Sequence, residues 1–187
     1  KQDEGTAITR QTEACQICKD AGVILEHAMM RLTLANYFLQ FKRNEEAEIE
    51  FREAERLAIT IPAYPQIAQI RMALAFIYLR KKKTWGKAIH EYEQAATAAS
   101  IGESLLLYID SLRMAGATYL KKKDRESAIL CWGAAVEKSR QMSKEEIRAS
   151  TFLDIAAKFI KVLEKNKMHA QAESVENLVL EIGEKFQ

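Results

Sequence analysis

The sequence predicts an all-α protein, a right-handed α-solenoid of antiparallel helix pairs, and three observations lead to this prediction. Glycine and proline, 7 and 2 of the 187 residues, are too few for many tight turns. Few segments alternate apolar and polar residues with the period of a strand. A pattern of alanine, then an aromatic residue or cysteine four positions on, then alanine three positions later, returns four times. Such self-similarity is typical of repeat arrays.

The repeated pattern places its three residues on one helical face, because offsets of four and seven are close to whole turns. The four copies are Ala14, Cys18 and Ala21; Ala47, Phe51 and Ala54; Ala88, Tyr92 and Ala95; and Ala128, Trp132 and Ala135. Each alanine lets a neighbouring helix backbone come close, and the larger residue fills the space beside it. We therefore expect the aromatic residues in the core, and not stacked on nucleic acid bases.

Start and stop signals divide the chain into about nine helices. They are expected at residues 6–21, 23–41, 44–60, 66–80, 84–100, 103–121, 124–142, 143 to about 165, and about 170–185. Asn44 and Asp124 are expected N-caps, and Ser143 with Glu146 forms a capping box.

The ends of the expected helices carry residues that stop a helix. Gly22 and Gly102 follow the first and fifth helices. Pro62 and Pro65 enforce the break between the third and fourth. Asn166 separates the last two helices.

We expect one domain over residues 1–187, formed by helix pairs. Residues 6–21 are a half repeat or an N-terminal cap, followed by pairs at 23–60, 66–100 and 103–142 and a degenerate, capping pair at 143–186. The alanine anchors are 33, 41 and 40 residues apart. Since the chain starts at Lys1 without an initiator methionine, we expect it to be a segment of a longer protein.

The leading helix of each pair carries a small residue with an aromatic residue three positions later. These positions are Leu34, Ala35 and Phe38; Leu74, Ala75 and Tyr78; and Leu112, Ala115, Gly116 and Tyr119. With the alanine anchors, residues 28–142 resemble the tetratricopeptide repeat, in an extended form of about forty residues. This form is similar to repeats of polarity-complex adaptors, soluble NSF attachment proteins and Gram-positive peptide-pheromone receptors. The last pair matches less well, with Leu153, Ala157 and Ile160 before Ala170 and no aromatic residue after it.

The resemblance implies that the leading helices line a concave groove that binds a peptide or short helix of a partner. The inward positions are Met29, Leu32, Asn36, Leu39, Gln69, Met72, Phe76, Leu79, Asp110, Arg113, Ala117, Leu120, Asp154, Lys158 and Lys161. This groove is apolar at one end and charged at the other. In the alternative interpretation, Met29, Leu32 and Leu39 pack under the N-terminal helix.

The turns between paired helices are basic, although the net charge is only +2. Their cations are Lys42, Arg43, Arg80, Lys81, Lys82, Lys83, Lys121, Lys122, Lys123, Arg125, Lys165 and Lys167. Because a solenoid stacks equivalent turns, we expect a positive edge for an acidic protein surface, anionic lipid or nucleic acid. The alternative is that these cations only complement the dipoles of the helix ends.

Residues with catalytic or metal-binding chemistry are scattered. Cys15 and Cys18 form the one metal-like pair, and His27, His90, His169 and Cys131 lack ligand spacing, so we expect structural cysteines and no metal. The carboxylates of residues 45–55 are expected on a solvent face, paired with Arg52 and Arg56. No glycine-rich phosphate loop or nucleophile elbow is present.

The sequence therefore predicts a non-enzymatic protein–protein interaction module without a cofactor, such as an adaptor, scaffold or chaperone, and no small-molecule substrate. The alternatives are the peptide-sensing array of a signalling receptor and a docking module that uses the basic edge. An odd number of cysteines and the lack of a long apolar run favour the cytoplasm.

Overall fold

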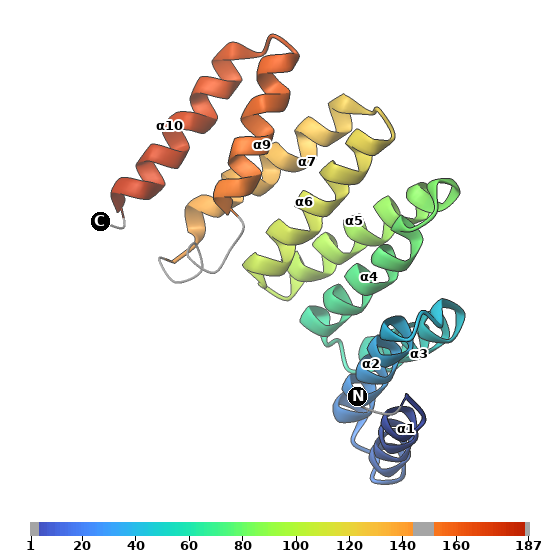
Figure 1. The fold of residues 1–187 in the computed structure, drawn as a ribbon. Coiled ribbons are helices and arrows are strands. Elements are labelled where there is room, and N and C mark those ends of the chain that lie inside the picture. Colours follow the sequence, from blue (N-terminus) through green and yellow to red (C-terminus); the bar gives the residue numbers. More distant parts are fainter. Residues whose placement is uncertain (1–3, 144–151, 186–187) are drawn as a thin grey trace. The chain divides into compact units, whose positions relative to one another are not determined.

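The computed structural model describes residues 4–143 and 152–185 of the chain. Within these ranges the fold is all-α, with nine α-helices, two short 3-10 helices and no strand (Figure 1). The prediction of an all-α fold of paired helices is thereby confirmed. The chain divides into two compact units, Lys1–Glu103 and Ser104–Gln187.

Unit 1 is a series of antiparallel helices in which each helix packs on the next (Figure 1). Its elements are α1 (Glu4–Asp20), α2 (Ile24–Gln40), α3 (Asn44–Thr60), α4 (Tyr64–Leu79), a 3-10 turn (Lys82–Thr84) and α5 (Trp85–Ile101). The pairs α2–α3 and α4–α5 have the most extensive packing, as expected for helical hairpins.

Unit 2 contains two further pairs. Its elements are α6 (Leu105–Lys121), α7 (Arg125–Lys138), a 3-10 turn (Ser139–Gln141), α9 (Phe152–Lys165) and α10 (His169–Lys185). Helix α7 packs on both α6 and α9, and α9 packs on α10. The observed bounds agree with the expected ones to within a few residues, except for the eighth helix, whose expected first turn after Ser143 lies outside the described residues.

Three of the four alanine–aromatic anchors form the core. Their buried residues are Ala47, Phe51, Ala54, Ala88, Tyr92, Ala95, Ala128, Trp132 and Ala135. The first copy is different, because Ala14 and Cys18 are half-buried and Ala21 is exposed. Helix α1 packs on α2 and instead buries Ala7 and Cys15.

The last pair uses a register different from the expected one. Ala157 and Ala170 are exposed, whereas Ala156 and Phe159 of α9 are buried, together with the α10 residues Ala172, Val175 and Leu178. Phe159 decides this register, because its ring packs edge-on against Trp132 with the ring centroids 6.0 Å apart. The leading helix of the last pair thus shows the same small-x-x-aromatic spacing as the earlier ones.

The N-cap prediction is confirmed for one helix and wrong for another. Asp124 accepts a hydrogen bond from the backbone N–H of Ser127, 3.1 Å away, at the start of α7. Asn44 is already the first residue of α3, and its side-chain oxygen instead accepts a hydrogen bond from Arg80. The expected capping box reaches Glu146, which lies outside the described residues.

The breaks between helices follow the glycine and proline signals only in part. Gly22 adopts a φ of 69°, a left-handed conformation that glycine reaches without steric cost. Pro62 lies in the α3–α4 turn, but Pro65 lies inside the first turn of α4, where a missing N–H costs nothing. Helix α4 therefore begins two residues before its expected start.

Gly116 of α6 is required by the packing of its pair. A Cβ atom at this position would lie 2.5 Å from Nε1 and 2.6 Å from Cδ1 of Trp132. The same indole Nε1 donates a hydrogen bond to the backbone oxygen of Arg113, 3.0 Å away. The indole cannot move away without losing this bond.

We expect Gly116→Ala to lower the free energy of unfolding by about 1–3 kcal/mol, the usual cost of an overpacked core. Gly133→Ala is the matched control, because its Cβ would meet only Phe159 Cζ, at 3.9 Å. Since alanine is the better helix former, this control should be stabilising by roughly 0.5–1 kcal/mol. Urea unfolding followed by circular dichroism measures both. Equal stability of Gly116→Ala and the wild type would contradict the packing described here.

Candidate binding surfaces

Helix α4 exposes an apolar stripe. Met72 and Leu79 are half-buried, and the ring of Phe76 between them is 48% exposed. Spacings of four and three residues place all three on one face of the helix. Gln69 is exposed one turn before them, and the guanidinium of Arg80 lies 5.4 Å from the Phe76 ring centroid. The stripe thus has a polar residue at one end and a cation at the other.

The predicted positions on α2 are less accessible. Leu32 is buried, Met29 and Leu39 are half-buried, and Asn36 is exposed. Helix α1 packs along α2, and Gln11 of α1 donates a hydrogen bond to the backbone oxygen of Met30, 2.9 Å away. Leu32 therefore contributes to the core of unit 1, which leaves Asn36 as the most exposed of these four residues.

The predicted positions in unit 2 are mostly polar. Asp110 and Arg113 pair with each other on α6 at 3.1 Å, and Ala117 and Leu120 are partly buried against the apolar core. Lys158 and Lys161 are exposed on α9, and the side chain of Asp154 lies outside the described residues.

The register of α9 also changes which of its residues are equivalent to the inward positions of the other leading helices. Counted from the buried Ala156, these positions are Ala157 and Ile160, one residue before Lys158 and Lys161.

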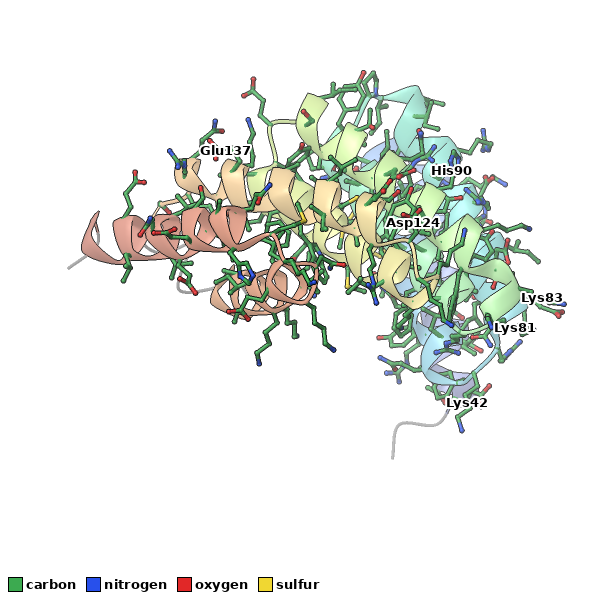
Figure 2. All side chains as sticks on the ribbon, turned by 90° about the horizontal axis from the view of Figure 1, so that it is seen from above. Lys42, Lys81, Lys83, His90, Asp124 and Glu137 are labelled. Atoms are coloured by element: carbon green, nitrogen blue, oxygen red, sulfur yellow. The ribbon has the colours of Figure 1, made fainter. Side chains whose placement is uncertain are left out.

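The basic turns of unit 1 lie at one end of the unit. Figure 2 shows Lys42, Lys81 and Lys83 at this end, and all three are exposed. A hydrogen bond of 2.5 Å from Arg80 to Asn44 connects the two turns. The structure therefore brings the predicted basic residues of this unit together.

Arg43, at the same end of unit 1, pairs with acidic side chains. It forms ion pairs with Glu46, one turn on in α3, and with Glu4 of α1, 3.4 Å away. Its charge is therefore balanced within unit 1. The exposed lysines carry the net positive charge of the turns.

The basic turns of unit 2 surround a hollow of about 640 Å³. Its lining residues are Leu120, Lys123, Arg125, Val162, Lys165 and Asn166. Arg125 donates a hydrogen bond to Asn166, 3.2 Å away, and so joins the start of α7 to the end of α9. Lys121 and Lys122 are exposed beside it.

Sequence reasoning missed a second, apolar hollow of about 400 Å³ in unit 2. Its lining residues come from α7, the 3-10 turn after it, α9 and α10, and are Ile129, Leu130, Gly133, Ala134, Val136, Glu137, Arg140, Phe159, Leu163, Gln171, Ser174, Val175 and Leu178. Leu130 on its rim is 74% exposed. The adjacent small residues Gly133 and Ala134 are the sequence signal that could have indicated an open space beside α7.

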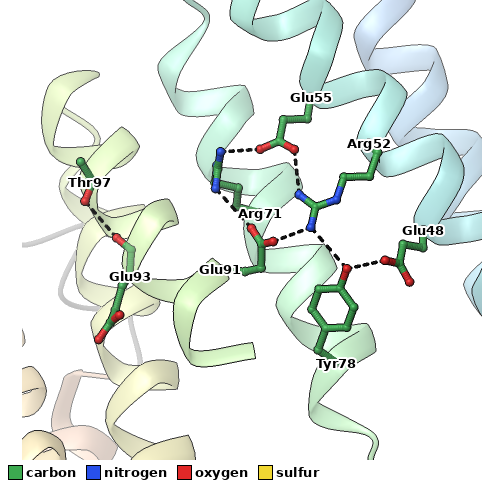
Figure 3. Close-up of polar contacts among 8 residues, drawn as sticks. All are labelled: Glu48, Arg52, Glu55, Arg71, Tyr78, Glu91, Glu93 and Thr97. Atoms are coloured by element: carbon green, nitrogen blue, oxygen red, sulfur yellow. Dashed lines mark hydrogen bonds and ion pairs between the residues drawn. The ribbon is translucent and has the colours of Figure 1, made fainter. Parts of the chain in front are cut away.

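A network of charged side chains connects α3, α4 and α5 (Figure 3). Arg52 of α3 binds Glu55 at 2.9 Å and Glu91 of α5 at 2.5 Å. Arg71 of α4 binds the same two carboxylates, at 2.7 Å and 3.3 Å. The two arginines thus bridge two carboxylates from different helices. The arrangement holds three helices together through ion pairs, three of which are also charge-assisted hydrogen bonds.

Tyr78 extends this network. Its hydroxyl donates a hydrogen bond to Glu48 and accepts one from Arg52, 3.3 Å away. Burial and the hydrogen bond to the Glu48 carboxylate raise the pKa of Tyr78. The phenol therefore stays protonated and remains a donor at neutral pH.

The network corrects the prediction of a solvent-facing carboxylate for one residue of α3, Glu55. Glu55 is only 7% exposed, and its partner carboxylate on α5, Glu91, is 5% exposed. The apparent pair of Arg52 and Glu55 on one helix is part of a larger cluster in which the two carboxylates are buried. Buried charges persist in proteins when they are paired, and Arg52 and Arg71 pair both carboxylates.

Substitution of two glutamates of α3, Glu55 and Glu53, tests how much the network contributes to the free energy of unfolding. Glu55→Ala leaves Arg71, which is 20% exposed, without one of its two carboxylates, so we expect a loss of roughly 2–4 kcal/mol in unfolding free energy. Glu53→Ala removes the same charge from a pair with the exposed Arg56 and should cost at most about 1 kcal/mol. Urea unfolding of both variants at one pH measures the difference. Equal losses would contradict a special role of the buried pair.

Cysteine and histidine do not form a reactive cluster in the described part of the chain. All three cysteines are free thiols, and burial raises the pKa of Cys15, which disfavours a thiolate. Among the described residues, no group of three His, Cys, Asp or Glu side chains is placed to hold a metal ion. His90 and His169 are exposed.

His27 is the buried histidine, and it predicts a pH dependence of stability. Burial, and next the positive charge of Arg31, lower its pKa below the ordinary 6.5. Arg31 Nε also donates a hydrogen bond to His27 Nε2, 3.1 Å away, which requires an unprotonated nitrogen.

Below pH 6.5 the unfolded chain therefore takes up a proton at His27 that the folded chain does not bind until its lower pKa is reached. The free energy of unfolding should fall as the pH drops through this window. We expect a lower urea midpoint at about pH 5.5 than at about pH 7.5, and a smaller difference in His27→Gln. His90→Gln, at an exposed position, should leave the difference unchanged. A His27→Gln protein with the full pH dependence would contradict this assignment.

Comparison with known proteins shows the fold alone. No protein-family model matches the chain, and neither does any curated protein sequence. The structure is similar to the crystal structure of BtubC (BKLC) from P. vanneervenii, with a TM-score of 0.66 and 11% sequence identity. The similarity covers 96% of this chain and 82% of that one. Within the described residues, no helix is both long and apolar enough to cross a membrane.

Proposed function

We propose that this chain is a non-enzymatic protein-binding module that holds a peptide or short helix of a partner against the exposed face of α4. The observation that carries the proposal is Phe76, a large aromatic side chain left 48% exposed between Met72 and Leu79. Aromatic side chains and methionine are enriched at the centres of protein interfaces. Burial of such a stripe by a partner would remove its apolar surface from water.

The spacing of the buried residues supports a tetratricopeptide-like repeat as the framework of this module. The pairs Ala35 and Phe38, and Ala75 and Tyr78, are buried at equivalent points of α2 and α4. In such repeats the leading helices face the ligand, and α4 is a leading helix. A scaffold, an adaptor, a chaperone and a peptide-sensing receptor would all use this surface in the same way.

We also propose a cytoplasmic location. The three cysteines are free thiols in the structure, which is the form that a reducing compartment maintains.

Substitution of Phe76 tests the proposal. Peptides selected from a phage-displayed random library on the wild-type chain are labelled, and their dissociation constants are measured by fluorescence anisotropy. Phe76→Glu and Met72→Glu should each weaken binding about tenfold or more, because a buried aromatic or methionine contact is lost and a charge faces an apolar ligand. Both positions are accessible, so helical content by circular dichroism should stay unchanged.

Ile59→Glu is the matched control, since Ile59 is a 54% exposed aliphatic residue of the trailing helix α3. It should leave the dissociation constants unchanged. Enrichment of no peptide on the wild type, or equal binding by Phe76→Glu and the wild type, would refute the proposed function.

A further inference from the structure

The hollow at the turns of unit 2 combines an apolar floor with a cationic rim. Leu120 of α6 and Val162 of α9 are partly buried against the apolar core of the unit and form the floor. Lys123, Arg125 and Lys165 line the same hollow and are exposed. Of the described residues that line it, none is acidic. The hollow therefore concentrates three positive charges beside an apolar surface.

Arg125 is held in place by a neighbouring amide. Its Nη1 donates a hydrogen bond to Oδ1 of Asn166, 3.2 Å away. Asn166 is itself anchored at the end of α9, where its Nδ2 donates to the backbone oxygen of Val162 at 2.6 Å. A guanidinium has five N–H donors, and this bond uses one of them. The others are available, and the bond to Asn166 favours one orientation of the side chain, which lowers the entropy cost of binding an anion.

The acidic residues near the hollow do not line it. Asp124 follows Lys123 in the chain, and its two carboxylate oxygens accept hydrogen bonds from Ser127, at 3.1 and 2.9 Å, at the start of α7. Glu126 and Glu164 are exposed and do not line the hollow. The lining residues together carry a formal charge of +3, from Lys123, Arg125 and Lys165.

The positive charge of the hollow fits a dianion. A phosphate monoester carries about −1.5 to −2 charges at neutral pH and three strong acceptor oxygens, whereas one carboxylate or phosphodiester carries a single charge. Arginine recognises such oxygens with paired N–H groups, and lysines add point charges. A flat membrane surface would contact the exposed lysines but not Leu120 and Val162, which are only partly exposed, so it would leave the apolar floor unused.

We propose that this hollow binds a phosphoserine or phosphothreonine of a protein partner. The phosphate lies among Lys123, Arg125 and Lys165, and an apolar side chain next to the phosphorylated residue packs on Leu120 and Val162. The inference rests on the proposed function, because its ligand is a protein segment, but it uses a surface other than the α4 stripe.

Binding of a defined peptide pool tests the inference. The probe is a fluorescein-labelled degenerate peptide pool with phosphoserine fixed at the centre and leucine fixed after it, measured by fluorescence anisotropy on the whole chain. The wild type should bind this pool more tightly than the unphosphorylated pool. Lys123→Gln/Lys165→Gln should weaken binding about tenfold or more, because two charge-assisted contacts are lost. Arg125→Lys keeps the positive charge but loses the paired N–H groups of the guanidinium, so it should also weaken binding.

The double variant Lys81→Gln/Lys83→Gln is the matched control, because it removes two exposed lysines from a turn of unit 1. It should bind the phosphorylated pool as the wild type does. Equal weakening in both double variants would show a general charge effect and overturn the inference. So would equal binding of the two pools, or tighter binding of oligothymidylate or of phosphatidylcholine–phosphatidylserine vesicles. The two proposals can fail separately. Phe76→Glu should weaken binding of the library-selected peptides, and Lys123→Gln/Lys165→Gln should weaken binding of the phosphorylated pool.

Discussion

Close approach of helix backbones, permitted by alanine and glycine and completed by one aromatic residue, is the contact on which each helix pair depends. In the pair α6–α7 the space between Gly116 and Trp132 excludes even a methyl group. In the pairs α2–α3 and α4–α5, Phe51 and Tyr92 are buried between alanines that are fully buried. Because this packing sets the separation of the helices, it also decides which side chains remain on the surface, including Phe76.

Much of the fold follows from the sequence, because each alanine–aromatic anchor has a strong local signal. The prediction fails where the signal is ambiguous. In α9, Ala156 and Ala157 are adjacent, and either could be the small residue of the pair. Contact between Phe159 and Trp132 selects the first register, and this contact depends on tertiary packing that a periodicity does not contain. Asn44 fails as a cap for a similar reason, since Arg80 binds its side chain.

The candidate sites were predictable to different degrees. The basic turns are visible as runs of lysine, and the structure adds the amide that positions Arg125 and the hollow that the run surrounds. The buried ion network was not predictable, because Arg52 and Glu55 read as an ordinary surface pair of one helix. The burial of Glu55 depends on Arg71, which comes from the next helix. A hydrogen bond between arginine and asparagine joins neighbouring turns in both units. In unit 1 the arginine, Arg80, follows a leading helix and the asparagine, Asn44, begins a trailing helix, whereas in unit 2 Arg125 begins a trailing helix and Asn166 follows a leading helix.

The contrast between the ion network of unit 1 and the apolar cluster of Trp132, Phe159 and Leu163 in unit 2 has a thermal consequence. The penalty for removing charged groups from water decreases on heating, whereas the stabilisation from apolar burial levels off. Warming therefore raises the relative contribution of the ion network that joins α3, α4 and α5. Unit 1 has this network in addition to its apolar core, so the balance of stabilising interactions changes with temperature more in unit 1 than in the cluster around Trp132.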